Sequence, residues 1–406
     1  RMVDTRLARL AGKKVGSAGV LVVDHCSNEV LSWVVSHVGQ AKQRFNQIDT
    51  VRVPRQPGSA LKPFLYALAL QKGWHAATLI DDSPTQARVG QGLHEYHNYS
   101  HRYYGLIPLR EALGNSLNIP AIKTVDYVGT ENYLGFLRRV GIHSLDDHPH
   151  VYGDGIALGK CEISLFELVQ AYTTLARQGH FVALKVLQDR AVAGAGANGR
   201  LPPKSACFSY QAEGTSQVMD ATAASLIADI LADPGARDKE FGRHSILNLP
   251  YQTAVKTGTS SDYRDAWALG FTDRLTVGVW MGNMDYQPMV EVTGSTGPAT
   301  VLRSVFHQLN KNRDVQVLAL DQDLRRIRIC RDTGRMVGED SEYQSCEMRD
   351  ELFSIEQLAT LKQPSIHTDA RAAGPVKNGS DIDSDESVRL TRELTSGPRI
   401  SKPSQG

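Results

Sequence analysis

The sequence predicts a mixed α/β (α+β) fold: one antiparallel sheet with flanking helices and an inserted helical subdomain. Residues 18–39 hold two apolar, β-branched runs around a polar turn, which is the pattern of a β-hairpin. After Leu249 the chain shows three short runs divided by Gly, Asp and Asn, which predict consecutive antiparallel strands. Helical patterns fill the middle of the chain. Because strands come first and last, we expect both groups to share one sheet, with the helices inserted between them.

The helices are predicted as separate segments, most of them closed by a turn signal. A long apolar helix follows Pro57 and ends near Gly73. The pattern at 162–179 is amphipathic and ends on a glycine typical of a C-cap, and the pattern at 216–235 begins with Ser216 as its N-cap. The other helical patterns cover residues 109–118, 120–129, 131–141 and 304–311. The aromatic-rich residues 94–105 are predicted to form a loop.

Composition limits the class of protein. The chain of 406 residues is 41% hydrophobic and 22% charged, which is typical of a globular protein with a large core. Its formal net charge of +1 argues against nucleic-acid binding, which is usually accompanied by a basic excess. No run approaches the roughly 18 apolar residues that span a bilayer, and the first residues do not form a signal peptide. We expect any export signal or membrane anchor to lie upstream of Arg1.

The chain is expected to divide into four parts. Residues 1–14 are predicted to be a linker, 15–313 the main domain, and 314–364 a small C-terminal extension. Residues 365–406 are rich in Gly, Ser, Asp and Pro and are predicted to be a disordered linker or the edge of a further domain. The five cysteines are an odd number spread widely along the chain, which fits neither a disulfide framework nor a zinc pattern. Cys330 and Cys346 are the one close pair, and either a disulfide or two thiols fits them.

A serine and a lysine near the start of the first long helix suggest nucleophilic chemistry. Ser59 and Lys62 are three residues apart, which on a helix places their Cβ atoms about 5–6 Å from each other. A serine hydroxyl needs a base, and a lysine can be that base when its pKa falls toward about 7–8. Pro63 fits the first turn, where a missing N–H costs little. Alone, however, this short motif favours an ordinary Ser-capped helix with a solvated lysine.

Two further motifs change that balance. Ser116-Leu117-Asn118 lies at the end of a helical pattern, and Lys256-Thr257-Gly258-Thr259 lies on the first late strand. Each is weak by itself. In this order the three match the S-x-x-K, S-D-N and K-T-G set of penicillin-binding proteins and class A β-lactamases, with S-L-N in the middle position.

The flanking residues carry a family resemblance. The segments "RQPGSALKPFLYALAL", "YYGLIPLREALGNSLNIPAI" and "AVKTGTSSDYRDAWALGFTDRLTVGVWMGN" closely resemble the transpeptidase domain of class A penicillin-binding proteins, and the 1C subgroup best. The resemblance covers roughly residues 15 to 312 and continues weakly through the Cys330–Cys346 unit. It implies a penicillin-binding/serine β-lactamase-like transpeptidase fold.

The resemblance also implies an activity: peptidoglycan D,D-transpeptidation through an acyl-enzyme, inhibited by β-lactams. Ser59 would attack the D-Ala-D-Ala carbonyl of a stem peptide, and the backbone N–H groups of Ser59 and Thr259 would form the oxyanion hole. The implied catalytic residues are Ser59, Lys62 and Ser116, and the implied substrate-binding residues are Asn118, Lys256, Thr257, Gly258 and Thr259. No cofactor or metal is implied. The implied partners are stem peptides, β-lactams and other cell-wall synthesis proteins, and the implied location is periplasmic, next to the inner membrane.

Three departures from the family pattern stand out. No acidic glycosyltransferase motif is present, so that activity is not expected from this chain. Where the family often shows P-x-N-Y-D, residues 96–100 read Y-H-N-Y-S, and the usual Gly-Gly before the long helix is Gly159-Lys160. The last two bear on the shape of the substrate cleft and touch none of the three motifs.

Other interpretations stay open at this point. A D,D-carboxypeptidase or β-lactamase of the same fold would use water as acceptor, although no class A glutamate-bearing loop is evident. A β-lactam-sensing or scaffold domain would keep the motifs without catalysis. A histidine- and aspartate-rich segment at 143–154 favours a polar surface loop over a metal site. His94, His97 and His101 would line the cleft or pack at a boundary, and Asp265 and Trp267 are expected near the core.

Overall fold

The computed structural model describes residues 1–89, 92–186, 215–336 and 346–361. These residues belong to one compact unit, Arg1–Lys362. The predicted linker at 365–406 lies outside the described residues. Within the ranges given, no helix combines the length and the apolar character needed to cross a membrane.

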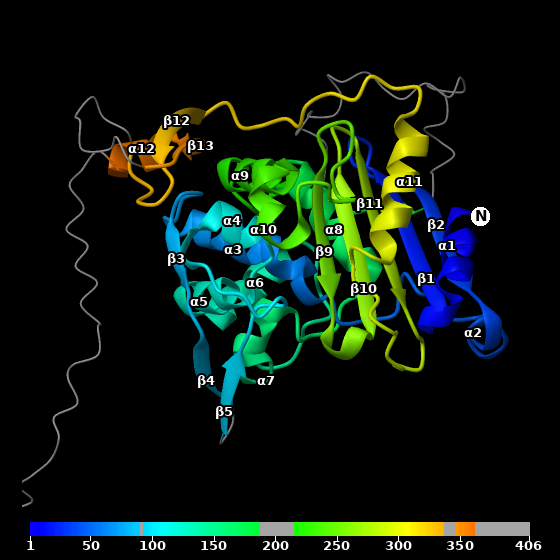
Figure 1. Ribbon diagram of the computed structural model, residues 1–406. Helices are drawn as coiled ribbons and strands as arrows, with labels where there is room; N and C mark the ends of the chain where they lie inside the picture. The colour runs from blue at the N-terminus through cyan, green and yellow to red at the C-terminus, as the bar shows by residue number, and fades with distance from the viewer. Residues whose placement is uncertain (90–91, 187–214, 337–345, 362–406) are drawn as a thin grey trace, which may run out of the picture. The chain divides into compact units, whose positions relative to one another are not determined.

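A five-stranded antiparallel sheet forms the centre of the unit (Figure 1). Its order is β2-β1-β11-β10-β9, so the early hairpin pairs with the late strands through β1 and β11, with Ser17 opposite Gly282. The strands are β1 (Ser17–Asp24), β2 (Glu29–His37), β9 (Ala254–Thr259), β10 (Asp265–Phe271) and β11 (Leu275–Gly282). This arrangement confirms the predicted sheet, in which early and late strands enclose the helical residues.

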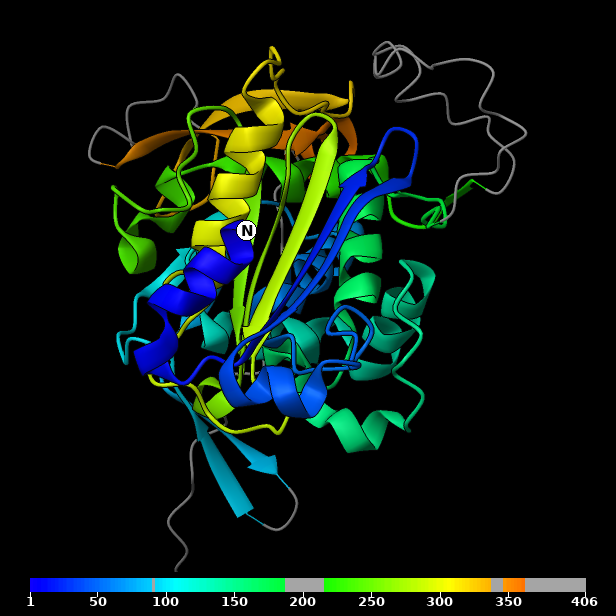
Figure 2. The same cartoon turned by 90° about the vertical axis from the view of Figure 1, so that its right-hand side faces the viewer.

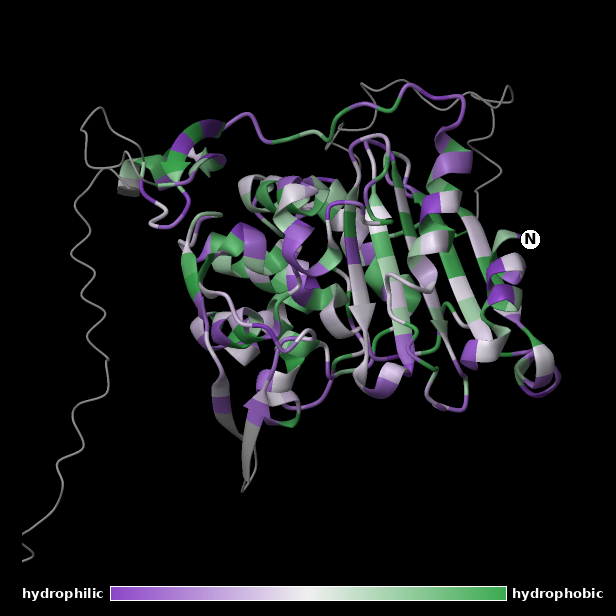
Figure 3. Cartoon of the chain, viewed as in Figure 1, coloured by the Kyte–Doolittle hydropathy of each residue, from purple (hydrophilic) through white to green (hydrophobic). Residues whose placement is uncertain are grey.

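Helices cover both faces of the sheet (Figure 2). On one face lies α8 (Leu165–Ala176), which begins with a capping box between Ser164 and Glu167. On the other lie α11 (Pro298–Asn310) and α1 (Met2–Arg9). In Figure 3 the strands are mostly hydrophobic, whereas α1 and α11 carry both hydrophobic and hydrophilic residues, as expected for helices with one face toward solvent.

The presence of α1 corrects one prediction. Residues 1–14 do not form a simple linker, because Val3, Leu7 and Leu10 share one helix face and are buried against the sheet and α11. Their spacing is that of an amphipathic helix. The many basic residues of this segment obscured the pattern.

A helical subdomain sits beside the sheet. Its central helix α3 (Lys62–Gln71) is buried from Lys62 to Leu70, which explains why its sequence is apolar on all sides. The surrounding helices are α4 (Leu109–Gly114), α5 (Asn118–Val128), α6 (Thr130–Arg139) and α9 (Ala221–Ala232). Shorter helices are α2 (Gly39–Phe45), α7 (Pro149–Tyr152) and α10 (Asp238–Phe241). The predicted helices are therefore present, with boundaries shifted by a few residues.

Three small two-stranded antiparallel sheets account for two local errors of the sequence analysis. They are β3 (Leu79–Asp82) with β6 (Gly105–Pro108), β4 (Thr85–Val89) with β5 (Gly92–Tyr96), and β7 (His180–Phe181) with β8 (Ser216–Gln217). His94 therefore belongs to a strand and not to a loop. Ser216 belongs to β8, and the helix predicted to begin there starts after Asp220. In both cases pairing with a partner strand overrides the local pattern.

The C-terminal extension is a hairpin, β12 (Leu324–Cys330) with β13 (Met348–Ser354), followed by α12 (Ile355–Leu361). Ile329 and Phe353 pack against Ala77. The predicted boundary at residue 313 stays a prediction, but the extension is joined to α4 by the buried ion pair between Arg110 and Glu351, which is described below. Cys330 and Cys346 are two thiols joined by a hydrogen bond. Cys26 forms a disulfide bond, which the spacing of the cysteines did not predict.

Candidate active site

Ser59 lies in a tight turn that two glycines make possible. Residues Gly58–Leu61 form a short 3-10 helix, and the α-helix begins only at Lys62. Gly58 has a φ of +54°, and a Cβ there would lie 2.4 Å from the carbonyl oxygen of Thr259. A Cβ on Gly258 would lie 2.2 Å from the carbonyl oxygen of Pro57. Strand β9 can therefore run directly beside the Ser59 turn only because neither position carries a side chain.

Lys62 is buried beneath Ser59 and donates to the S-L-N segment. The side chain is 0% exposed, and its Nζ lies 2.7 Å from Ser116 O and 2.8 Å from Leu117 O. A third hydrogen bond of 2.8 Å reaches Asn118 Oδ1. Burial, and next the charge of Lys256, hold the pKa of Lys62 well below its ordinary value. Ser59 Oγ has no hydrogen-bond partner among the described residues, so a proton transfer to Lys62 requires a small reorientation of the amine.

Ser116 joins the two lysines. It follows α4 with a φ of +61°, a left-handed conformation that is strained for a residue with a side chain. Asn115 holds this turn, since its Nδ2 donates to the carbonyl oxygen of Ala236 at 2.8 Å. As a result the carbonyl of Ser116 accepts from Lys62, and its hydroxyl accepts from Lys256 Nζ at 2.7 Å.

Lys256 is the second buried cation of the site. It is 3% exposed, and burial, followed by the charge of Arg237, lowers its pKa to about 7. Strand β9 therefore brings to Ser116 a lysine that exchanges its proton close to neutral pH. Sequence reasoning missed Arg237, because nothing local relates it to the K-T-G motif.

Asn118 is positioned by hydrogen bonds to residues 96–100, the segment that departs from the family pattern. Its Nδ2 donates to His97 O at 2.8 Å, and its backbone N–H donates to Asn98 Oδ1 at 2.8 Å. Asn98 is 1% exposed and donates to both carboxylate oxygens of Asp82, at 2.8 and 2.9 Å. Residues 96–100 lack the proline and the acid of the family pattern, but they keep Asn98, which contacts the site through Asn118. Asn98 and Asp82 are functional candidates that the sequence analysis did not single out.

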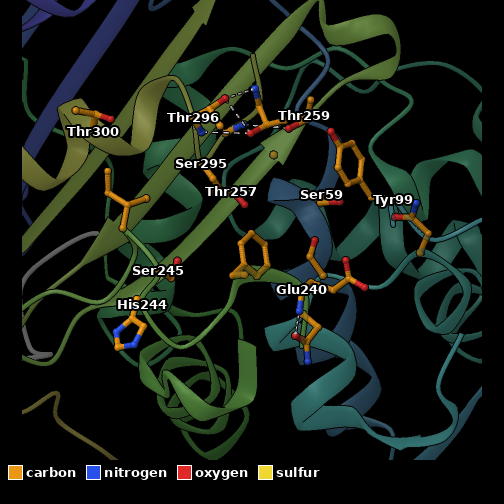
Figure 4. A pocket seen from close by; sticks show the side chains of 18 of the residues that line it. Ser59, Tyr99, Glu240, His244, Ser245, Thr257, Thr259, Ser295, Thr296 and Thr300 are labelled. Carbon is orange, nitrogen blue, oxygen red and sulfur yellow. Dashed lines mark hydrogen bonds between the residues drawn. The ribbon is translucent and has the colours of Figure 1, made fainter. Parts of the chain in front are cut away.

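The site opens into a cavity of about 700 Å³ (Figure 4). Ser59, Ser116, Asn118 and the T-G-T part of β9 line it, and Thr259 Oγ1 accepts a hydrogen bond of 3.1 Å from Gly294 N. A smaller cavity of about 260 Å³ shares Ser59, Asn118 and Thr259 with it. Ser59 is therefore reachable from two sides.

Tyr99 lines both cavities. Its hydroxyl lies 3.0 Å from that of Tyr263, which belongs to the turn after β9. Lys160, the residue in place of the family's second glycine, lines the smaller cavity together with Asp262. That departure from the pattern therefore changes the charge of the cleft wall.

The remaining candidates are accounted for structurally. Trp267 is buried and donates from Nε1 to Gln56 O at 2.7 Å, so it belongs to the core and also supports the loop before Ser59. Asp265 is buried and accepts from Trp280 Nε1. His97 bonds to Tyr103 OH. Within the described residues, no group of three or more His, Cys, Asp or Glu side chains could hold a metal ion.

Together, the three motifs meet at one place. The Ser59 turn, the S-L-N segment and β9 surround the same cavity, with Lys62 and Lys256 buried beneath its floor. A hydroxyl beside two amines of lowered pKa, with backbone N–H groups at hand, is an arrangement suited to acyl transfer.

Comparison with known proteins identifies relatives of the chain. Residues 18–286 match the family model described as the penicillin binding protein transpeptidase domain. The chain is 31% identical over 290 residues to penicillin-binding protein 1C of Escherichia coli K12, covering 71% of this chain and 34% of that protein. It is 29% identical to penicillin-binding protein 1B of Vibrio cholerae, covering 73% of this chain and 36% of that protein. The chain thus spans about a third of the length of these relatives.

Solved structures share the fold. Penicillin-binding protein 1A from Haemophilus influenzae superposes with a TM-score of 0.69 at 20% identity, covering 84% of this chain and 53% of that one. The PonA1 protein from Mycobacterium tuberculosis in complex with penicillin V superposes with a TM-score of 0.61, also at 20% identity, covering 79% and 85%.

Proposed function

The chain belongs to the penicillin-binding protein transpeptidase family, and we propose that it forms the part of a peptidoglycan D,D-transpeptidase that cross-links stem peptides through a Ser59 acyl-enzyme. The observation that carries this proposal is the convergence of Ser59, the two buried lysines and the S-L-N segment on one cavity. Family membership supports the reaction class, and the geometry supports the assignment of roles.

In the acylation step, Ser59 Oγ attacks the carbonyl carbon of the penultimate D-Ala and Lys62 takes the hydroxyl proton. The lowered pKa of Lys62 supports this role, because an ordinary lysine is protonated at neutral pH. The N–H groups of Ser59 and Thr259 stabilise the oxyanion, and one such donor typically contributes about 10²–10³ in rate. The close approach of β9 to the Ser59 turn supports this pairing.

The leaving amine receives its proton from the Ser116 hydroxyl, which Lys256 reprotonates through its hydrogen bond to Oγ. The terminal carboxylate of the donor binds beside Lys256, with the hydroxyls of Thr257 and Thr259 as further donors. Asn118 positions the donor amide. In the second step an amine of another stem peptide attacks the ester, and Ser59 regains its proton.

The setting follows from the substrate. Peptidoglycan lies outside the cytoplasmic membrane, so we assign the chain to the periplasm, attached to the inner membrane through another part of the protein. Other cell-wall synthesis proteins are the expected macromolecular partners, and β-lactams the expected inhibitors.

The decisive experiment is mass spectrometry of the intact chain after exposure to a penicillin, followed by mapping of the modified peptide. A persistent adduct on Ser59, absent in Ser59→Ala, supports the proposal. An adduct on another residue, or none, overturns the assignment of the nucleophile. Rapid turnover of the penicillin would instead favour a hydrolase of the same fold.

A second experiment separates an enzyme from a sensor. The chain is incubated with a D-Ala-D-Ala donor peptide and an amine acceptor, and both the amide product and the released D-Ala are quantified. Amide formation above the Ser59→Ala background supports transpeptidation. Release of D-Ala without amide indicates a carboxypeptidase, and absence of both indicates a non-catalytic domain.

A further inference from the structure

The cavity beside Ser59 extends well beyond the three motifs. Besides the motif residues it is lined by Arg6 of α1 and by residues 293–296 and Thr300, which lead into and begin α11. Residues 293–296 link the Ser59 end of the cavity to the Arg6 end. Gly294 lies close to Thr257, since an added Cβ on Gly294 would lie 2.7 Å from Thr257 Cβ. Arg6 Nη2 donates to the carbonyl oxygen of Thr296. In Figure 4, Ser295, Thr296 and Thr300 appear on the other side of Thr257 from Ser59.

The end of the cavity formed by Arg6, Ser295 and Thr300, the far end, holds hydrogen-bond donors that pair with no described carboxylate. Arg6 forms no ion pair with any described carboxylate, and its Nε is buried without a hydrogen-bond partner. The hydroxyls of Ser295 and Thr300 have no hydrogen-bond partner among the described residues either. The one acidic side chain lining this cavity is Glu240, which already accepts from Ser100 Oγ and Tyr104 OH at 2.6 and 2.8 Å.

The Arg6 side chain is half-buried and donates to the carbonyl oxygen of Thr296, but no described carboxylate neutralises its charge. Guanidinium groups are also the side chains best suited to bind a carboxylate through two parallel hydrogen bonds. The far end is therefore suited to an anionic group of a ligand.

The position of Ser116 in the large cavity indicates which ligand binds at the far end. Ser116, the proposed proton donor to the leaving amine, lines the large cavity and is not among the residues lining the smaller one. By microscopic reversibility the attacking amine takes the position that the leaving amine has vacated. An acceptor therefore reaches the Ser59 ester through the large cavity, and whatever is attached to its amine extends toward Arg6.

We propose that Arg6, Ser295 and Thr300 form a carboxylate subsite for the acceptor, which selects amines linked to a carboxylate at least one residue away. This inference rests on the proposed transpeptidase function. The terminal carboxylate of the donor binds nearer, beside Lys256. In the transfer, the amine nitrogen bonds to the acyl carbon, the ester bond to Ser59 Oγ breaks, and the amine proton passes to Oγ through Ser116.

The test uses the full chain and a D-alanyl thioester donor, whose acylation of Ser59 releases a thiol. Two acceptors compete in one reaction: triglycine, and triglycinamide, which lacks the carboxylate. The ratio of the two amide products is measured, since loss of folded enzyme lowers both products equally. We expect wild type to prefer triglycine by about tenfold, the typical effect of a charged hydrogen bond.

Substitutions of Arg6 and Thr300 should change the ratio of the two amide products. In Arg6→Gln the ratio should fall to near one, Arg6→Lys should retain part of the preference, and Thr300→Val should lower it moderately. The matched control is Arg9→Gln, an exposed arginine on the same helix, which should keep the wild-type ratio. The competition between glycine and glycinamide should not change in Arg6→Gln, because so short an acceptor does not reach Arg6.

The possible outcomes distinguish failure of the subsite proposal from failure of the transpeptidase proposal. Equal use of triglycine and triglycinamide by wild type, or an unchanged ratio in Arg6→Gln, overturns the subsite while leaving the transpeptidase proposal intact. Failure of wild type to release thiol, or to form amide with any acceptor, counts against the proposed function itself.

Discussion

Lys256 donates a hydrogen bond of 2.7 Å to the hydroxyl of Ser116, a residue whose carbonyl oxygen simultaneously accepts from Lys62 at the same distance. One residue in a left-handed conformation thereby connects two buried amines from different elements, α3 and β9. The Ser116 hydroxyl can exchange a proton directly with Lys256. After burial, the charge of Lys256 is the second cause that lowers the pKa of Lys62, since like charges this close disfavour the doubly charged state.

The first prediction concerns pH. The pKa of Lys256 is lowered to about 7, so its ammonium form, which binds a substrate carboxylate, is lost as pH rises through that value. We expect the second-order rate of Ser59 acylation by a penicillin to decline on the alkaline side of about pH 7. In Arg237→Gln the decline should move to higher pH, because the charge of Arg237 is the second cause of the shift.

The control for this profile is Arg243→Gln, which changes an exposed arginine. An alkaline limb that stays in place in Arg237→Gln would contradict the assignment to Lys256. Linkage gives a second check. Because the folded state binds this proton less tightly than the unfolded state, folding stability should rise with pH between about 7 and 10.

The second prediction concerns the base. Lys62→Gln removes the amine while leaving a side chain able to donate to the S-L-N segment, so the fold should persist. General-base catalysis typically contributes about 10²–10⁴ in rate, and we expect the acylation rate to fall by that factor. Time-resolved labelling with a fluorescent penicillin measures it, with circular dichroism as the check on folding. A loss of less than about fivefold would exclude Lys62 as the base.

The third prediction concerns the contact between β9 and the Ser59 turn. In Gly258→Ala the new methyl group would meet Pro57 O at 2.2 Å, so the turn has to move away from the strand. Such overpacking typically costs about 1–3 kcal/mol. We expect a lower Tm and, at a temperature where the chain is folded, slower acylation. Gly12→Ala is the control, because no atom lies within 4 Å of its added methyl group. Equal behaviour of the two variants would show that the close approach does not matter.

The fourth prediction concerns the C-terminal extension. Arg110 of α4 bonds to both oxygens of Glu351 on β13, at 2.7 and 2.5 Å, and both residues are buried. Glu351→Ala leaves Arg110 buried with a weaker set of partners, which typically costs about 3–5 kcal/mol. The matched control is Asp350→Ala, which breaks an exposed pair with Arg328 and should cost less than about 1 kcal/mol.

Urea denaturation monitored by tryptophan fluorescence measures both free energies of unfolding. Because α4 leads directly into Ser116, Glu351→Ala should also slow acylation. Equal free energies of unfolding for Glu351→Ala and Asp350→Ala would mean that the ion pair between Arg110 and Glu351 does not stabilise the packing of the extension against α4.

The sequence by itself determined the sheet, the order of the helices and the residues of the three motifs. Strand alternation, apolar periodicity and turn residues are local signals, and the motif letters survive in any context. It could not show that Ser116 adopts a left-handed backbone, that Asn98 and Asp82 support Asn118, or that Arg237 acts on Lys256, because these relations join residues distant in the chain.

Only the tertiary structure decided the role of the first residues. As a sequence, residues 1–14 are a short basic stretch, and neither their composition nor their spacing relates Arg6 to Ser59. Packing of Val3, Leu7 and Leu10 against the sheet and α11 places Arg6 in the wall of the cavity. There the half-buried guanidinium donates to the carbonyl oxygen of Thr296 but meets no described carboxylate, and that property depends on contacts between distant elements, which no local pattern encodes.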